Sequence, residues 1–118
     1  MTQTPLSIVT FGVDQNTAQQ VRNRLRARGI NADSYVVFNT PTSDAEIATI
    51  VASKKWDGLI IGFGVQKERP WFERVLQLIK NANPNVPMIQ HQGPNDLEHA
   101  IERHFGIQLP PNSNTDNA

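Results

Sequence analysis

Cysteine is absent from this chain of 118 residues. Its absence excludes disulfide bridges, thiolate nucleophiles, cysteine-ligated zinc and iron–sulfur clusters. A chain without cysteine also fits the reducing interior of a cell, so we expect a cytoplasmic protein.

An excess of charge of either sign is missing as well. The 11 Lys and Arg residues balance the 11 Asp and Glu residues, which gives a formal net charge of +0 at pH 7. A chain of this kind carries no broad positive field that would attract nucleic acid or an anionic membrane. We therefore expect neither of them as a partner.

Long apolar runs are absent too. No run approaches the ~20 residues of a membrane-spanning helix, and residues 1–5 are too short and polar for a signal peptide. The length suits one domain with one hydrophobic core. We expect a single α/β domain over residues 1–106 and a disordered C-terminal tail over residues 107–118, which is polar and contains two prolines.

What the chain does contain is a fourfold alternation of strand and helix patterns. The expected strands cover residues 6–11, 34–38, 58–61 and 86–90, and the expected helices cover about residues 16–28, 43–54, 70–81 and 95–105. Ser43 and Glu46 match a capping box at the start of the second helix. The pattern predicts an α/β fold, a three-layer sandwich around a four-stranded parallel sheet with strand order 2-1-3-4.

The third expected helix has an unusually broad apolar side. Its large apolar residues span roughly 160° of the helical wheel, where ~100° would cover one face of a sheet. They are Trp71, Phe72, Val75, Leu76, Leu78 and Ile79. Either a neighbouring helix or a second copy of the chain covers the excess, and we predict a homodimer that buries Trp71 or Leu78.

The third expected strand leads directly into a glycine-rich turn. In open parallel α/β sheets, ligands bind at the carboxyl ends of the strands, where the strand order reverses. Glycines at such a point allow a ligand to approach the backbone closely. The residues that we expect to contact a ligand are Gln15, Asn16, Asn39, Gly62, Phe63, Gly64, Gln66, Lys67 and Arg69.

Two of these residues, Lys67 and Arg69, precede the helix that is expected to begin at Pro70. The free N–H groups and the dipole of a helix N-terminus favour an anion, so the pair indicates a phosphate or carboxylate ligand. The alternative is that the two side chains belong to a solvated loop.

Two titratable residues lie beside the same loops. His91 follows the fourth expected strand, where it is either a general acid or base that titrates near neutral pH or an ordinary surface histidine. Asp14 precedes the first helix, where it either orients a substrate or acts as a base, or else is a helix cap. His99 and His104 are five residues apart and do not share a helix face, so we expect no metal site.

The order of the elements resembles the flavodoxin-like and response-regulator receiver architecture, a Rossmann-like sandwich. Receivers carry a phospho-accepting aspartate at the end of the third strand, where this chain has Gly62, so no phosphoacceptor role is expected. A loose similarity of residues 10–17 to the flavodoxin phosphate loop is opposed by the negative charge of Asp14.

A second resemblance covers about residues 57–105 and is to a family of small, functionally unassigned bacterial α/β proteins. It is carried by Ile61-Gly62, Gly64, Phe72-Glu73, Pro94, Asp96 and Ala100. That family often has arginine two residues after its second glycine, whereas this chain has Gln66 there. The resemblance implies no particular reaction.

The sequence leaves two functions open. The first is a small module that binds a small anionic molecule or a protein partner at the carboxyl edge of its sheet. The second is a small enzyme, a lyase, isomerase or hydrolase, with His91 and Asp14 as acid and base. We prefer the first, because the polar residues at the strand ends are mostly amides and hydroxyls, and we expect no cofactor in either case.

Overall fold

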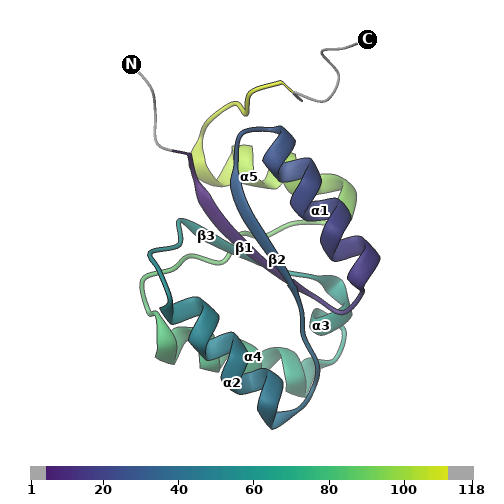
Figure 1. Cartoon of the computed structure of the whole chain (residues 1–118), viewed down its shortest axis with the longest axis vertical. Helices are drawn as coiled ribbons and strands as arrows, with labels where there is room; N and C mark the ends of the chain where they lie inside the picture. The colour runs from purple at the N-terminus through teal and green to yellow at the C-terminus, as the bar shows by residue number, and fades with distance from the viewer. Residues whose placement is uncertain (1–4, 112–118) are drawn as a thin grey trace.

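The computed structural model describes residues 5–111 and contains an open, parallel, three-stranded sheet (Figure 1). The strands are β1 (Ser7–Gly12), β2 (Asn31–Val36) and β3 (Gly58–Ile61), in the order β2-β1-β3. The helices are α1 (Gln15–Ala27), α2 (Pro41–Ala52), α3 (Phe63–Gln66), α4 (Arg69–Ala82), η1 (Pro94–Asp96) and α5 (Leu97–Phe105). The α/β class and the relative order of the first three strands are confirmed.

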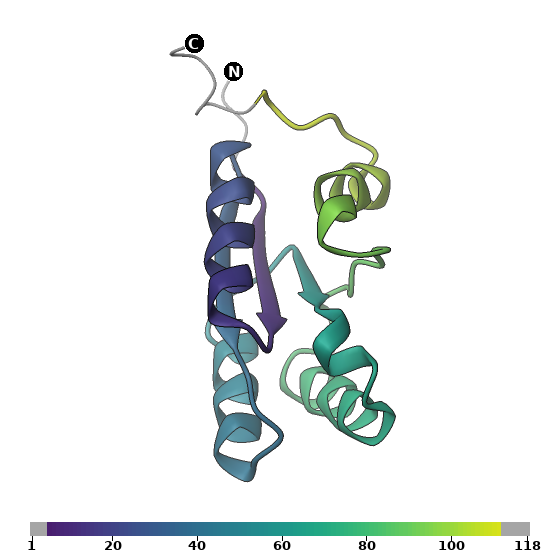
Figure 2. The same cartoon turned by 90° about the vertical axis from the view of Figure 1, so that its right-hand side faces the viewer.

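Helices cover both faces of the sheet (Figure 2). Successive strand residues point to opposite faces, so the apolar runs of β1 and β3 supply two separate cores. Val9 and Leu59 belong to the core beneath α2 and α4, whereas Ile8 and Ile60 belong to the core beneath α1 and α5. No helix in residues 5–111 is long and apolar enough to cross a membrane.

The expected fourth strand does not form, and the prediction of four strands is wrong. Residues 86–90 run beside β3, but only Met88 makes a bridge, to Leu59. Two hydrogen bonds hold the segment beside β3, from Leu59 N–H to the Pro87 carbonyl (3.0 Å) and from Ile89 N–H to the Leu59 carbonyl (2.8 Å). Pro87 has no N–H, and Val86 N–H turns back to Asn83, so the segment has too few donors for a ladder.

The start of α2 also differs from the prediction. Thr40 is its N-cap and accepts a hydrogen bond from Ser43 N–H at 3.1 Å. Ser43 lies inside the helix, 2% exposed, and its hydroxyl accepts from Phe38 N–H at 2.9 Å. The capping box at Ser43 and Glu46 is therefore wrong, because Pro41 already fits the first helical turn.

The broad apolar side of α4 is covered within the chain. Trp71 is 4% exposed, and Phe72 and Leu76 pack against the core that α4 shares with α2. Of the large apolar side chains exposed in the described part of the chain, none belongs to α4. The neighbouring-helix alternative thus accounts for most of the apolar arc, whereas Leu78 is half-buried. The homodimer through Trp71 or Leu78 stays a prediction.

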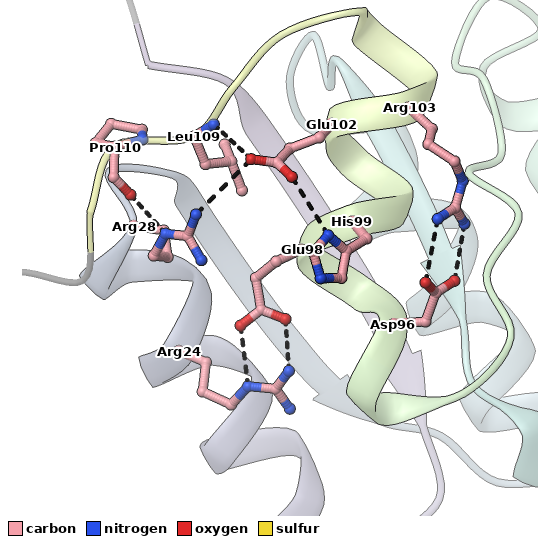
Figure 3. A network of polar contacts seen from close by, with 9 residues as sticks. All are labelled: Arg24, Arg28, Asp96, Glu98, His99, Glu102, Arg103, Leu109 and Pro110. Carbon is pink, nitrogen blue, oxygen red and sulfur yellow. Dashed lines mark hydrogen bonds and ion pairs between the residues drawn. The ribbon is translucent and has the colours of Figure 1, made fainter.

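The packed core continues past residue 106, where we expected the tail to begin. Leu109 is 6% exposed, and its N–H donates to the Glu102 carboxylate at 2.9 Å (Figure 3). The guanidinium of Arg28, which caps the C-terminus of α1, donates to the Pro110 carbonyl and lies 3.8 Å from the same carboxylate. Residues 107–111 therefore connect the end of α5 to α1, and the rest of the expected tail lies outside the described residues.

Candidate functional site

A cavity of about 220 Å³ lies at the carboxyl end of the sheet. Its walls come from the ends of β1 and β3, the first half of α1, the short helix α3, and Leu97 at the start of α5. Figure 2 shows the arrowheads of β1 and β3 ending between α1 on one side and α3 and α5 on the other. The cavity is therefore on the α1 and α5 face, at the edge where the strand-end rule places ligands.

Asp14 lies at this cavity as the N-cap of α1. Its carboxylate accepts hydrogen bonds from both Thr17 N–H and the Thr17 hydroxyl, each at 2.8 Å. These two bonds lower the pKa of the exposed Asp14 carboxyl below its ordinary value. Capping thus occupies one of its oxygens, and the side chain remains a negative charge beside the cavity.

His91 lines the cavity and contacts the end of β3 on the side where a fourth strand would lie. Its Nε2 lies 3.0 Å from the Ile61 carbonyl, and Gly93 N–H donates to its Nδ1 at 3.2 Å. The neutral tautomer with hydrogen on Nε2 satisfies both contacts. Ile89 N–H donates to the Leu59 carbonyl, and the next carbonyl on this edge of β3 is that of Ile61. In a four-stranded sheet a backbone N–H would donate to it, and here the His91 imidazole takes that place.

Phe63 fixes the other side of His91. The two rings stack with centroids 5.0 Å apart and an interplanar angle of 17°. Phe63 opens α3, a single helical turn that the glycine pattern did not predict, and its side chain is 44% exposed. The stacked pair gives the cavity an aromatic wall.

Two of the three glycines that line the cavity differ in what surrounds them. A Cβ on Gly64 would collide with Val13 Cγ2, so the missing side chain there allows α3 to pack on the loop before α1. A Cβ on Gly12 would meet nothing within 4 Å. Gly12 shares the cavity-facing side of β1 with Ile8 and Thr10, so Gly12, and not Gly64, is the glycine that leaves room for a ligand.

The residues expected to bind an anion lie beside the cavity and not in it. Gln66 is half-buried and donates from Nε2 to the Ile61 carbonyl at 2.7 Å. Lys67 is exposed and lines a second, more open depression with Phe63. Arg69 is exposed in the first turn of α4, next to Glu68.

The remaining expected contacts are also outside the cavity walls. Gln15 and Asn16 are exposed in the first turn of α1. Asn39 accepts a hydrogen bond from Arg74, which also pairs with Asp44, on the opposite face of the sheet. The structure therefore brings Asp14, His91 and the segment 62–64 together at the cavity. Gln66 meets His91 only at their shared acceptor, the Ile61 carbonyl, and the other expected residues lie outside the cavity lining.

Several cavity residues were not predicted as site residues. Thr10, Val21 and Leu97 are among the lining residues, and Thr10 donates its hydroxyl hydrogen to the Ser34 hydroxyl at 2.6 Å. A hydroxyl inside the otherwise apolar stretch 8–11 was the available signal for Thr10. Val21 and Leu97 read as core residues, and only the packing of the helices places them at a cavity.

The cavity wall supplied by α5 is held in place by charged groups. Arg24 of α1 binds Glu98 with Nε and Nη2, at 3.2 and 2.5 Å (Figure 3). At the start of α5, Asp96 binds Arg103 at 2.8 Å and accepts from Gln92 N–H at 3.0 Å. The Arg103 hydrogen bond, followed by that of Gln92, lowers the pKa of the Asp96 carboxyl from 3.8 to about 2.

The chemistry of the lining is mostly apolar, with one carboxylate and one imidazole and without any lysine or arginine. Across residues 5–111, no three His, Asp or Glu side chains converge as a metal ion would need. Comparison of the chain with protein-family models, with curated proteins and with solved structures gives no match.

Proposed function

We propose that the protein is a small binding module that takes a compact, largely apolar, uncharged or cationic molecule in the cavity at the carboxyl end of its sheet. The observation that carries the proposal is the position of this cavity together with its lining. An apolar pocket with a few convergent polar groups at a strand-order reversal is the usual form of a ligand site in an open α/β sheet.

The size and charge of the cavity limit the ligand. A volume of about 220 Å³ is below the ~300–1,000 Å³ of pockets for drug-sized molecules, so a single ring or a short branched chain fits. The Asp14 carboxylate favours a cation over an anion at the cavity. The anionic ligand that we expected near Lys67 and Arg69 stays a prediction for a different surface.

Two other expectations remain part of this proposal. A cytoplasmic location rests on the absence of cysteine. A flavodoxin-like architecture is supported by the strand order β2-β1-β3 and by residues 87–89, which lie beside β3 where a fourth strand would be.

Catalysis is the second candidate, favoured by the position of Asp14 and His91 at the same cavity. In that case the protein is a cofactor-free lyase, isomerase or hydrolase. The hydrogen bonds of both side chains speak for structural roles, because neither ring nitrogen of His91 is left without a backbone contact. Replacing His91 with Gln separates the two: ligand affinity kept within a few-fold supports the module, and a turnover loss of ~100-fold supports the enzyme.

The binding proposal is tested with three probes that share one ring and differ in charge. Benzyl alcohol, benzylamine and benzoate are titrated into ¹⁵N-labelled protein, and amide chemical shifts are followed by NMR. We expect saturable shifts at Gly12 and Gly62 with the alcohol and the amine, and weaker ones with benzoate. Benzoate as the strongest of the three, or no shift at the cavity, would contradict the proposal.

A pair of variants shows whether the cavity itself holds the probe. Gly12→Ala adds one methyl group and Gly12→Leu fills the space with a branched side chain, and neither meets a neighbour at Cβ. Binding should fall in the order native, Ala, Leu, with the Leu variant at least about tenfold weaker. The melting temperature should stay within a few degrees, and unchanged affinity in a folded Gly12→Leu variant would exclude this cavity.

A further inference from the structure

The outer edge of β2 carries backbone groups that point away from the sheet. Asn31 N–H donates to the Leu6 carbonyl and Val37 N–H to the Gly12 carbonyl, both at 2.8 Å. Odd-numbered residues of β2 therefore pair with β1, and because alternate residues of a strand point to opposite sides, Ala32, Ser34 and Val36 direct their N–H and carbonyl groups outward.

Both ends of this edge are closed by side chains. The Arg26 guanidinium donates to the Ala32 carbonyl at 2.8 Å and reaches on to the Asp33 carboxylate at 3.1 Å. Lys54 approaches the other oxygen of Asp33 at 3.8 Å. Beyond the strand, the outward Phe38 N–H is taken by the buried Ser43 hydroxyl. Native proteins protect sheet edges in this way against unwanted strand pairing.

The window between these closures is open. In the described part of the chain, the outward N–H and carbonyl groups of Ser34 and Val36 have no hydrogen-bond partner. Next to them, Tyr35 is 37% exposed and lies against Phe11, with ring centroids 6.1 Å apart. Tyr35 is thus an apolar surface on the α2 and α4 side of the window.

The α1 side of the window is positively charged. Arg24 and Arg28 face α5, whereas Arg26 extends over the β2 edge. Arg22 is one turn before Arg26 and so shares its side of the helix. Its buried Nε has no hydrogen-bond partner within residues 5–111. The residues at this spacing along α1 are Gln15, Gln19, Arg22 and Arg26, and none is acidic.

We propose that the open window of β2 binds an extended segment of a partner protein in which acidic and apolar side chains alternate. The added strand would pair with the outward groups of Ser34 and Val36. Because its side chains alternate between faces, acidic residues would meet Arg22 on the α1 side and apolar residues would meet Tyr35 on the other. A second copy of the chain fits this edge less well, since pairing two β2 strands would bring two acid-free α1 surfaces together.

The test uses labelled synthetic peptides and fluorescence anisotropy. A short peptide of alternating Val and Glu should bind saturably, and its Val and Lys counterpart at least about tenfold more weakly. In the Val and Glu peptide, N-methylation of the alternate amides that face β2 should abolish binding, because it removes the hydrogen-bond donors to that strand. Absence of saturable binding by the Val and Glu peptide overturns the proposal.

Two variants separate the backbone contribution from the charge. Val36→Pro removes an outward donor and leaves the ladder with β1 intact, and Arg22→Glu reverses the charge of the α1 side; each should weaken binding about tenfold. Arg69→Glu makes the same change of charge away from this edge and should stay within about twofold.

The variants also give results that would refute the proposal. Equal losses in Arg22→Glu and Arg69→Glu, with unchanged circular dichroism, would mean unspecific attraction. A dimer in light scattering that Val36→Pro dissociates would assign the edge to a second copy.

Discussion

The two faces of the sheet are closed in different ways. On one face, α2 and α4 pack against each other, and Phe11, Trp56 and Trp71 fill the space above the strands. On the other, α1 and α5 leave a cavity at the strand ends, where Thr10 and Gly12 are small. One face of the sheet is thus closely packed and the other contains a cavity, because the side chains of the strands and helices are larger on the first face.

Matched valine truncations give the sharpest test of this difference. Val75 of α4 is 0% exposed in the filled core, and Val21 of α1 is 7% exposed at the cavity. Val75→Ala should lower the free energy of unfolding by about 2–3 kcal/mol, and Val21→Ala by about 1 kcal/mol, because Val21 already has fewer neighbours to lose. Urea unfolding measures both. Equal losses would indicate that the cavity side is packed as closely as the other.

Two ion pairs permit a second comparison, one on each face. Arg24–Glu98 connects α1 to α5, and Arg74–Asp44 connects α4 to α2, with similar side-chain exposures of 35%/17% and 41%/19%. Each arginine changed to Gln should cost no more than about 1 kcal/mol of global stability. Only Arg24→Gln should speed amide hydrogen exchange in α5, since α2 and α4 also hold each other by apolar packing. Faster exchange in both helix pairs would break the comparison.

The smallest expected effect concerns acid stability on the cavity side. The pKa of Asp96 is about 2 in the folded protein, below its ordinary value of 3.8. Since the folded pKa is depressed, its stabilisation is complete above a pH of about 3.8 and is lost as the pH falls toward 2. Asp96→Asn and Arg103→Gln should each flatten this part of the stability profile in urea titrations. A native-like slope in Asp96→Asn would assign the acid sensitivity to other carboxylates.

The elements that the sequence predicted well are those whose burial is strongest. β1 and β3 were placed to within a residue because they are mostly apolar and their central residues are all buried. β2 begins three residues earlier than expected, at Asn31 and not at Ser34, because the edge strand includes polar residues and is defined by pairing with β1. The pairing of residues 31–33 with β1 leaves no apolar pattern in this part of β2 itself.

The candidate site was predictable in the same partial sense. Strand order alone brings Asp14, Gly62 and His91 to one edge of the sheet. The contact of His91 with the Ile61 carbonyl depends on the absence of a fourth strand beside the end of β3. The helix α3 begins just after Gly62, whose N–H donates to the Phe11 carbonyl at 2.8 Å. Neither contact has a signature in the neighbouring residues. The sequence therefore predicted a glycine-rich turn in place of α3, and it did not predict the backbone contacts of the His91 ring.

The position of Leu109 sets an order in which the two cores become available as the chain is made from its N-terminus. The buried residues beneath α2 and α4 end with Ile79, whereas the core beneath α1 and α5 also needs Ile89, Leu97, Ala100, Ile101 and Leu109. Leu25 of α1, 0% exposed in the folded chain, therefore has no complete cover until Leu109 has been added to the nascent chain. The face that later carries the cavity is the face that a nascent chain leaves exposed longest, and the residues that close it are the last of those described.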